Sequence, residues 1–412
     1  MKNFIAHTDE IREKMLQEIS CYSDDDLFKQ IPVKFKNFDM ANPLSELETQ
    51  RKIKALAKKN KTEYANFMGG GVYNKFIPAA VNYVAQRFEF LTAYTPYQPE
   101  ISQGTLQIIY EYQTMISRLT GMDIANASMY DGGSACAEAV LMAHRIAKGK
   151  KNKALISNRL NPEYKEVVKT YCWAQDIELE WFDEIPEDVS EYFAVLIQYP
   201  DYYGEITPII KPDTTLIVCA NLSALSVIEP PREADIVVGD IQPLGISMNF
   251  GGPHAGYMAC KETYMRQMPG RLVGRTVDAD GKQAFTLTIQ TREQHIKREK
   301  ATSNICSNQS LIALSATLYL SLIGEKGFKQ TGIISANLAH ALSKMLNGKG
   351  IRTMNTNFFN EFVVEVDDAD GYLAKLKEAN ILGGIKLDDR RVLVCATEMN
   401  TEEDILNYIE AL

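Results

Sequence analysis

Two glycine-rich stretches of the sequence could bring backbone N–H groups to a ligand. In the first, Asp131-Gly132-Gly133-Ser134, the glycines stand directly before an alanine-rich segment that is typical of a helix. The free N–H groups and the positive dipole end of a helix start favour phosphate or carboxylate, so Gly132, Gly133 and Ser134 form a possible anion site. An ordinary loop with Ser134 as the helix N-cap is the alternative. The second stretch, Gly69-Gly70-Gly71, matches neither a P-loop nor a dinucleotide fingerprint and is predicted to be a flexible turn that lets the backbone approach other backbone or a ligand.

A second group of candidate residues lies in residues 92–104, where Pro96 and Pro99 prevent regular structure. Tyrosine hydroxyls, an amide and one carboxylate are the content of a recognition loop, with the hydroxyls from Tyr94 and Tyr97 and the carboxylate from Glu100. A surface loop without function is the alternative.

A third group lies in a basic stretch. Residues 261–300 hold nine Lys and Arg against five Asp and Glu, whereas residues 178–205 hold nine acidic side chains and no Lys or Arg. The basic stretch, which contains His295 and Arg298, could line the site of an anionic ligand or partner. A solvated charged face and a structural histidine are the alternatives.

The histidines and cysteines do not form a metal site in the sequence. The five histidines are scattered, and the seven cysteines are odd in number and never close neighbours. No H-E-x-x-H, C-x-x-C or disulfide framework can be recognised. We therefore predict no metal and a reducing compartment, the cytoplasm.

The hydrophobic periodicity predicts the elements that position these groups. Apolar residues recur every three or four positions from Gln103 to Leu119, with Gly121 as the C-terminal cap, and a second helix runs from about Ala135 to Lys148. Continuous apolar runs predict buried strands of a largely parallel sheet at residues 154–156, 193–197, 216–219 and 235–238. Residues 257–260 are predicted to form an antiparallel edge strand, and residues 285–289 a half-exposed one.

The C-terminal part is predicted to form a small α+β domain. A buried helix over residues 311–323 ends at Gly324. A helix to about Leu346, a strand at 362–364, a helix at 372–378, a strand at 392–395 and a final helix follow, with Thr401-Glu402-Glu403-Asp404 as the capping box of the last helix. We expect an α/β protein with three parts: an N-terminal helical arm with the glycine-rich loop (1–85), a large α/β domain (86–325) and a small α+β domain (326–412).

Composition narrows the classes of function. The 412 residues carry a net charge of −9, which disfavours electrostatic binding to nucleic acid or to an anionic membrane. The first residues contain no apolar core of a secretory signal, and the longest apolar stretch, 311–323, is too short to span a bilayer. A small molecule or a protein is the expected partner.

Several long motifs, spread over most of the chain, resemble one family. With them the sequence is similar to the P-protein (decarboxylating glycine dehydrogenase) of the glycine cleavage system, and within it to the alpha chains of the split, two-subunit form. The motifs are Gly69-Gly70-Gly71-Val72-Tyr73, residues 92–104, Tyr112-Gln113-Thr114-Met115, residues 119–123, residues 125–132, Gly251-Gly252-Pro253, Met268-Pro269-Gly270-Arg271 and residues 291–306.

The resemblance implies the fold of the type I pyridoxal-phosphate-dependent enzymes, the aspartate aminotransferase architecture. In such enzymes a lysine after a core strand forms a Schiff base with the cofactor. Here Pro243 stands at the lysine position, and no lysine occurs between Lys211 and Lys261. Asn221 stands where an acidic residue usually pairs with the pyridine nitrogen. We therefore expect that this chain does not bind the cofactor covalently.

The family's two-subunit form implies what such a chain does. A beta subunit supplies the lysine and the pyridoxal phosphate, and an α2β2 assembly decarboxylates glycine and passes the aminomethyl group to the lipoyl arm of the H-protein. The alpha chain would then form part of the wall of its partner's pocket, with Tyr94, Tyr97, Glu100, Ser102, His295 and Arg298 as the candidate residues. A degenerate scaffold or regulatory subunit without a direct catalytic role is the alternative.

The sequence departs from the family in two places. Tyr73-Asn74-Lys75 replaces a Tyr-x-His motif, so the role of that histidine does not carry over. Residues 200–214, with three prolines, connect two core strands where parallel neighbours normally need a crossover of a dozen or more residues. We expect the crossover helix to be missing or reduced to one turn.

Overall fold

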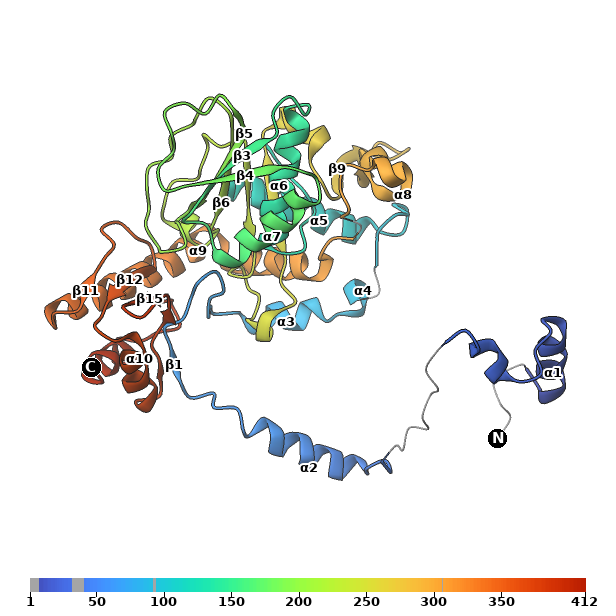
Figure 1. The fold of residues 1–412 in the computed structure, drawn as a ribbon, viewed down its shortest axis with the longest axis horizontal. Helices are drawn as coiled ribbons and strands as arrows, with labels where there is room; N and C mark the ends of the chain where they lie inside the picture. The colour runs from blue at the N-terminus through green and yellow to red at the C-terminus, as the bar shows by residue number, and fades with distance from the viewer. Residues whose placement is uncertain (1–6, 32–40, 92–93, 306) are drawn as a thin grey trace. The chain divides into compact units, whose positions relative to one another are not determined.

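The computed structural model describes residues 7–31, 41–91, 94–305 and 307–412, which belong to two units (Figure 1). The first unit, Met1–Thr62, contains the helices α1 (Asp9–Glu18) and α2 (Glu46–Ala57) and a 3-10 turn between them (Asp24–Phe28). None of its described residues is buried. The predicted helical character of the N-terminal arm is confirmed for these segments. The second unit, Glu63–Leu412, contains all the sites discussed below.

A seven-stranded sheet forms the centre of the second unit, in the order β2-β8-β7-β6-β5-β3-β4. All neighbours from β4 to β7 are parallel, whereas β8 is antiparallel to both β7 and β2. The strands are β2 (Ile124–Ala125), β3 (Lys153–Ser157), β4 (Glu178–Phe182), β5 (Tyr192–Tyr199), β6 (Thr215–Ala220), β7 (Ile236–Asp240) and β8 (Gly256–Cys260).

The four predicted buried strands are thus confirmed as β3, β5, β6 and β7. The prediction for residues 257–260 is only half right. Strand β8 is antiparallel, but it is not at the edge, because β2 pairs with its outer side. A strand of two residues leaves no periodic pattern in a sequence, so β2 could not be foreseen.

Two pairs of helices cover the sheet. On one face lie α6 (Gly132–Ile146) and α7 (Pro162–Trp173), in one core with Leu196 of β5. On the other lie α5 (Gln103–Thr120) and the first part of α9 (Ser310–Gly348), in one core with Val195. The neighbours Val195 and Leu196 point to opposite faces because side chains alternate along a strand. Helix α5 ends at Gly121 with φ 73°, as predicted.

The chain between β5 and β6 contains no helix. Residues 200–214 run as turns and extended chain, which confirms the missing crossover helix. The connection between β4 and β5, residues 183–191, is also without a helix. Figure 1 draws both connections as green loops beside the sheet.

The two helices predicted before and after Gly324 are both present, and together they form α9 (Ser310–Gly348). Gly324 has φ 60° and ψ −179°, so the chain kinks there, but a second helical stretch follows to Gly348. By length and composition α9 could cross a bilayer. Its residues Ala313, Ala316 and Tyr319 instead pack into the core against the sheet, so we interpret it as a core helix.

The remaining strands and helices lie around these layers. A four-stranded sheet has the order β11 (Arg352–Thr353), β12 (Glu361–Glu365), β15 (Arg391–Cys395), β14 (Ile385–Lys386). It shares a core with α10 (Ala369–Glu378) and α11 (Glu402–Glu410), whose capping box at Thr401 is present as predicted. Strand β1 (Ala65–Asn66) pairs with β13 (Ile381–Leu382), and β9 (Leu272–Val277) forms a hairpin with β10 (Gln283–Thr288). The short helices are α3 (Ala79–Ala85), α4 (Phe88–Leu91) and α8 (Gln294–Lys297). The division at residues 85 and 325 stays a prediction.

Candidate functional site

The loop before α5 and the basic segment around α8 meet at Tyr97. The ring of Tyr97 lies edge-on to the ring of His295, with 5.7 Å between the centroids. The Tyr97 hydroxyl accepts a hydrogen bond of 3.1 Å from the Arg271 guanidinium at the start of β9. Two of the residues predicted from distant segments are therefore neighbours. Tyr97 is 49% exposed, so the pair faces solvent.

Beneath this pair lies a buried ion pair. Arg271 is 3% exposed, and its Nε is 3.7 Å from Oε2 of Glu293, which is also 3.6 Å from Nδ1 of His295. A second Arg271 nitrogen donates to Asn308 Oδ1 at 3.3 Å. We call Tyr97, Arg271, Glu293 and His295 the Tyr97–His295 cluster.

Two buried polar atoms of the cluster and one near it in sequence lack a hydrogen-bond partner within the described residues. They are Nε of Arg271, Oε1 of Glu293 and, beside Tyr97 in sequence, Oγ1 of Thr95. Buried polar groups in folded proteins are nearly always paired, so these atoms are open to a partner such as water, an ion, a ligand or another chain. Arg271 and Glu293 were not predicted from the sequence, because single charges inside a charged stretch carry no signal of burial.

The other predicted residues lie outside the cluster. Tyr94 is largely exposed, with its hydroxyl 3.0 Å from Oγ of Ser307. Ser102 is the N-cap of α5 but makes no side-chain cap bond. Glu100 and Arg298 are exposed. The structure therefore brings together Tyr97 and His295 but not these four.

The position that the family resemblance marks for the cofactor contains a small cavity. Asn221, just beyond β6, and Pro243, beyond β7, line it together with Tyr164 and Asp240. Its volume is about 40 Å³. Pockets for cofactor-sized ligands are roughly 300–1,000 Å³, so the protein's own side chains fill this place.

The backbone groups of the possible anion site are also occupied. Gly132 N–H donates to Oδ2 of Asp240 at 3.1 Å, and Ser134 N–H donates to Oδ1 of Asp131 at 2.7 Å. Asp131, not Ser134, is therefore the N-cap of α6, and the alternative prediction of a serine N-cap is wrong. A Cβ at Gly132 would lie 2.3 Å from the Tyr164 hydroxyl. The carboxylates of Asp131 and Asp240 and the Tyr164 ring therefore occupy the place where an anion would bind. Burial raises the pKa of the Asp240 carboxyl group to about 6.

The glycine-rich loop is held in place by hydrogen bonds to Glu361. Both oxygens of Glu361 in β12 accept hydrogen bonds of 2.6 Å, one from Gly70 N–H and one from the Tyr73 hydroxyl. A Cβ at Gly69 would lie 2.2 Å from Glu361 Oε1, so only glycine allows this approach. The prediction of a flexible turn missed this contact, because its partner lies almost 300 residues away in the sequence. Burial raises the pKa of Glu361 to about 7.

We expect Glu361 to make stability depend on pH. The folded chain keeps its proton to about pH 7, whereas an exposed glutamate ionises near 4.5, so the folded state binds more protons between these values. The free energy of unfolding should therefore fall as pH rises from 4.5 to 7 and level off above. Glu361→Gln should flatten this dependence in urea unfolding, and Glu378→Gln on the surface of α10 should not. An unchanged slope in Glu361→Gln would contradict the assignment.

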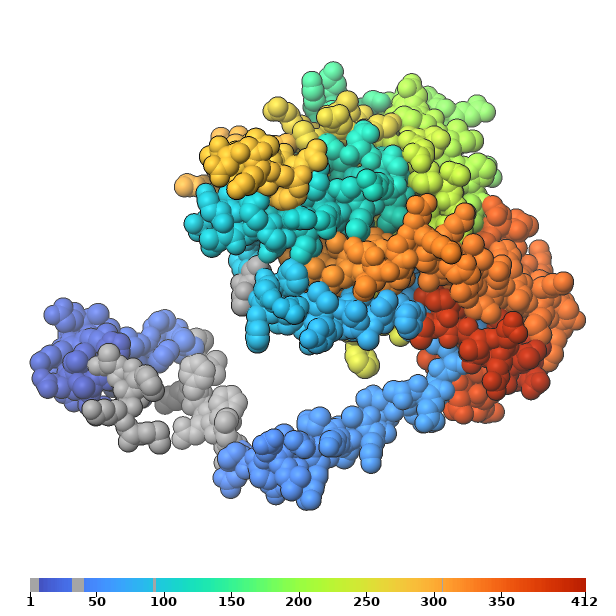
Figure 2. Space-filling model, turned by 180° about the vertical axis from the view of Figure 1, so that it is seen from behind, coloured from blue at the N-terminus to red at the C-terminus, as the bar shows by residue number. Residues whose placement is uncertain are grey.

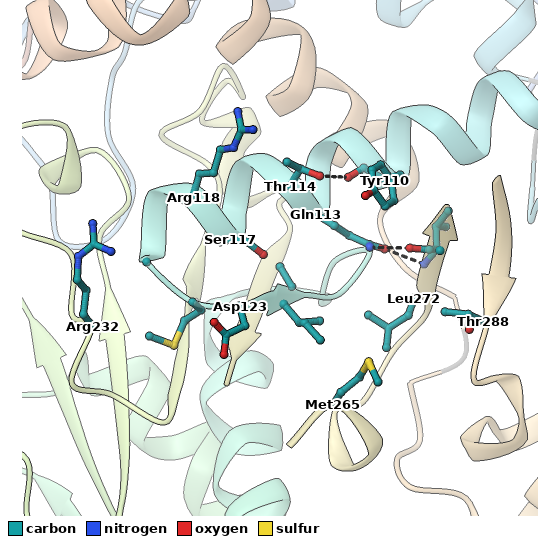
Figure 3. Close-up of a pocket in the computed structure, with 16 residues that line it drawn as sticks. Tyr110, Gln113, Thr114, Ser117, Arg118, Asp123, Arg232, Met265, Leu272 and Thr288 are labelled. Atoms are coloured by element: carbon teal, nitrogen blue, oxygen red, sulfur yellow. Dashed lines mark hydrogen bonds between the residues drawn. The ribbon is translucent and has the colours of Figure 1, made fainter. Parts of the chain in front are cut away.

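A separate groove of about 740 Å³ follows α5 (Figure 3). Arg118 and Arg232 lie at one end, and Gln113 joins α5 to both backbone groups of Val273 with bonds of 2.9 and 3.0 Å. None of the predicted site residues lines it. The groove is therefore distinct from the Tyr97–His295 cluster.

Comparisons with known proteins agree over the whole length of the chain. The sequence profile described as "Glycine cleavage system P-protein" matches residues 2–412. A protein of Geobacillus thermodenitrificans named "Probable glycine dehydrogenase (decarboxylating) subunit 1" is 44% identical over 100% of this chain and 99% of its own. A protein of Carboxydothermus hydrogenoformans with the same name is 44% identical over 99% of each chain.

Solved structures support the same assignment. The crystal structure of a glycine decarboxylase (P-protein) in inhibitor-bound form is 38% identical, with a TM-score of 0.86 and 99% of each chain covered. The glutamate decarboxylase of Lactobacillus brevis, 11% identical with a TM-score of 0.64 over 95% of this chain and 96% of its own, shares the fold alone. The predicted type I pyridoxal-phosphate-enzyme fold is thereby confirmed.

Proposed function

The chain belongs to the glycine cleavage system P-protein family, and we propose that it works as the alpha subunit of a two-subunit P-protein. The complex decarboxylates glycine and transfers the aminomethyl group to the lipoyl arm of the H-protein. Two full-length relatives carry "subunit 1" in their names, which implies a second subunit. Pyridoxal phosphate is the cofactor of the complex, in keeping with the fold.

The cofactor and its lysine belong to the partner beta subunit. This chain's own residues do not fit pyridoxal phosphate: Pro243 offers no amine, Asn221 carries no negative charge, and the cavity between them holds about 40 Å³. The nearest lysines in sequence, Lys211 and Lys261, both bind the Asp235 carboxylate away from this cavity. The observation that carries the proposal is therefore the filled cofactor position in a chain that covers 99% of its relatives' length.

The Tyr97–His295 cluster completes the beta subunit's pocket in this proposal. Tyr97 and His295 face outward. The buried Arg271 donates a hydrogen bond to the Tyr97 hydroxyl, and the buried Glu293 carboxylate contacts the His295 ring, so both side chains are held in position. An incoming subunit or substrate would supply partners for the unpaired Arg271 Nε and Glu293 Oε1. We propose an α2β2 assembly in the cytoplasm, where the free cysteines of the described chain would stay reduced.

Exchange of labelled bicarbonate into the glycine carboxyl group tests the proposal. The isolated chain should show no exchange above the background without protein, and mixing it with the beta subunit should restore full exchange. The beta subunit alone is the control for any activity that does not need this chain. Exchange by the isolated chain would contradict the proposal.

A further inference from the structure

One face of the central sheet lacks its usual covering helix. Val195 and Ile197 of β5 point to the face opposite α6 and α7, and on this face α5 and α9 share a core with the residues of β7 and β8. Helical crossovers from β4 to β5, past β3, and from β5 to β6 would normally cover the sheet here. Residues 183–191 and 200–214 lie there instead as loops. Figure 2 shows this light-green part of the chain at the surface.

These two loops enclose a groove of about 620 Å³, which we call the crossover groove. Its floor is apolar, with Phe182, Ile185, Val189 and Ile197 among the lining residues. Ile210 on the second loop is 74% exposed at its edge. An apolar surface of this kind, rimmed by polar residues, marks a site of interaction.

The rim of the crossover groove is strongly acidic. Its exposed carboxylates are Asp183, Glu184, Glu187, Asp188 and Asp213. Arg159 is the one cation among the lining residues, and its Nε is bound to Asp201. The groove therefore presents an excess of negative charge around an apolar floor, although Lys165 and Lys151 interact electrostatically with Asp183 and Asp188.

We propose that the crossover groove docks an amphipathic helix bearing lysine and arginine from another protein chain. Its apolar face would replace the missing crossover helix on the sheet, and its cations would pair with the rim. A second copy of this chain would bring one acidic rim against another, and an anionic membrane surface would be repelled. The crossover groove shares no residue with the Tyr97–His295 cluster, so this docking is independent of the proposed function.

Binding of a fluorescent peptide to the full chain tests the proposal. The probe is a designed helix with leucines at positions i, i+3, i+4 and i+7 and lysines elsewhere, and a scrambled peptide of the same composition is its control. The amphipathic peptide should bind about tenfold more tightly than the scrambled one, because only it presents a continuous apolar face. Equal affinity for the two peptides would overturn the proposal.

Substitutions locate the binding. The double variant Glu184→Lys/Glu187→Lys and the single variant Ile210→Ser should each lower the affinity of the chain for the amphipathic peptide about tenfold. The matched controls Glu325→Lys/Glu378→Lys and Leu406→Ser alter exposed positions elsewhere and should stay within about twofold. Thermal unfolding of each variant establishes that it folds. Folded groove variants that bind like the controls would overturn the proposal.

Discussion

Replacing Arg271 with methionine is expected to lower the bicarbonate exchange rate of the assembled complex about 100-fold. Removing one preorganised donor from an active site typically costs a factor of this size. Arg271 donates to the Tyr97 hydroxyl and to Asn308, and it faces the buried carboxylate of Glu293. Methionine fills a similar volume but leaves the Glu293 carboxylate without a positive partner and the Tyr97 hydroxyl without its donor. Tyr97 and His295 would then no longer be held in position.

Arg271 is a positioning residue, so the test must separate position from folding. Tyr97→Phe removes only the hydroxyl that Arg271 holds, and it should lower kcat with little change in the KM for glycine. Arg390→Met is the matched control, because Arg390 is exposed and makes only a 3.8 Å ion pair with Asp367. Gel filtration checks assembly. An assembled Arg271→Met complex with full exchange would support the alternative of a scaffold subunit.

Lys75→Met is expected to destabilise the chain by about 3–5 kcal/mol, the usual cost of leaving one member of a buried ion pair alone. Lys75 Nζ lies 2.5 Å from Oε2 of Glu398, and the two side chains are 2% and 6% exposed. Oε1 of Glu398 accepts from Phe76 N–H, and Ser335 Oγ donates to Oε2. Lys75 thus joins the segment after the glycine-rich loop to the C-terminal part of the chain.

Urea unfolding measures this effect. The double variant Lys75→Met/Glu398→Gln should recover part of the loss, because it removes both buried charges. Lys329→Met on the surface of α9 serves as the control and should change stability by less than about 0.5 kcal/mol. A loss below about 1 kcal/mol in Lys75→Met would mean that the pair contributes little.

The sheet could be predicted from the sequence because its strands are buried on both faces. Runs such as residues 193–197 and 216–219 are apolar throughout, and they became β5 and β6. The three prolines of residues 200–214 likewise indicated the missing helix. The break at Gly324 and the helix after it, to about Leu346, were also predicted, because glycine interrupts an apolar helical pattern that resumes beyond it.

The candidate site was less predictable, because its contacts join distant segments. Tyr97 and His295 were selected through the family resemblance, and only the structure places Arg271 and Glu293 beneath them. The contact of Glu361 with Gly70 likewise depends on folding and not on any local pattern. Wall roles for Tyr94, Glu100, Ser102 and Arg298 stay predictions.

The division of labour between two subunits is tested most directly by locating the cofactor. The assembled complex is reduced with borohydride, digested, and each lysine peptide is examined by mass spectrometry for a pyridoxyl group. We expect the label on one lysine of the beta subunit and on no lysine of this chain, since Pro243 occupies the position of the Schiff-base lysine. A stoichiometric label on a lysine of this chain would contradict that division.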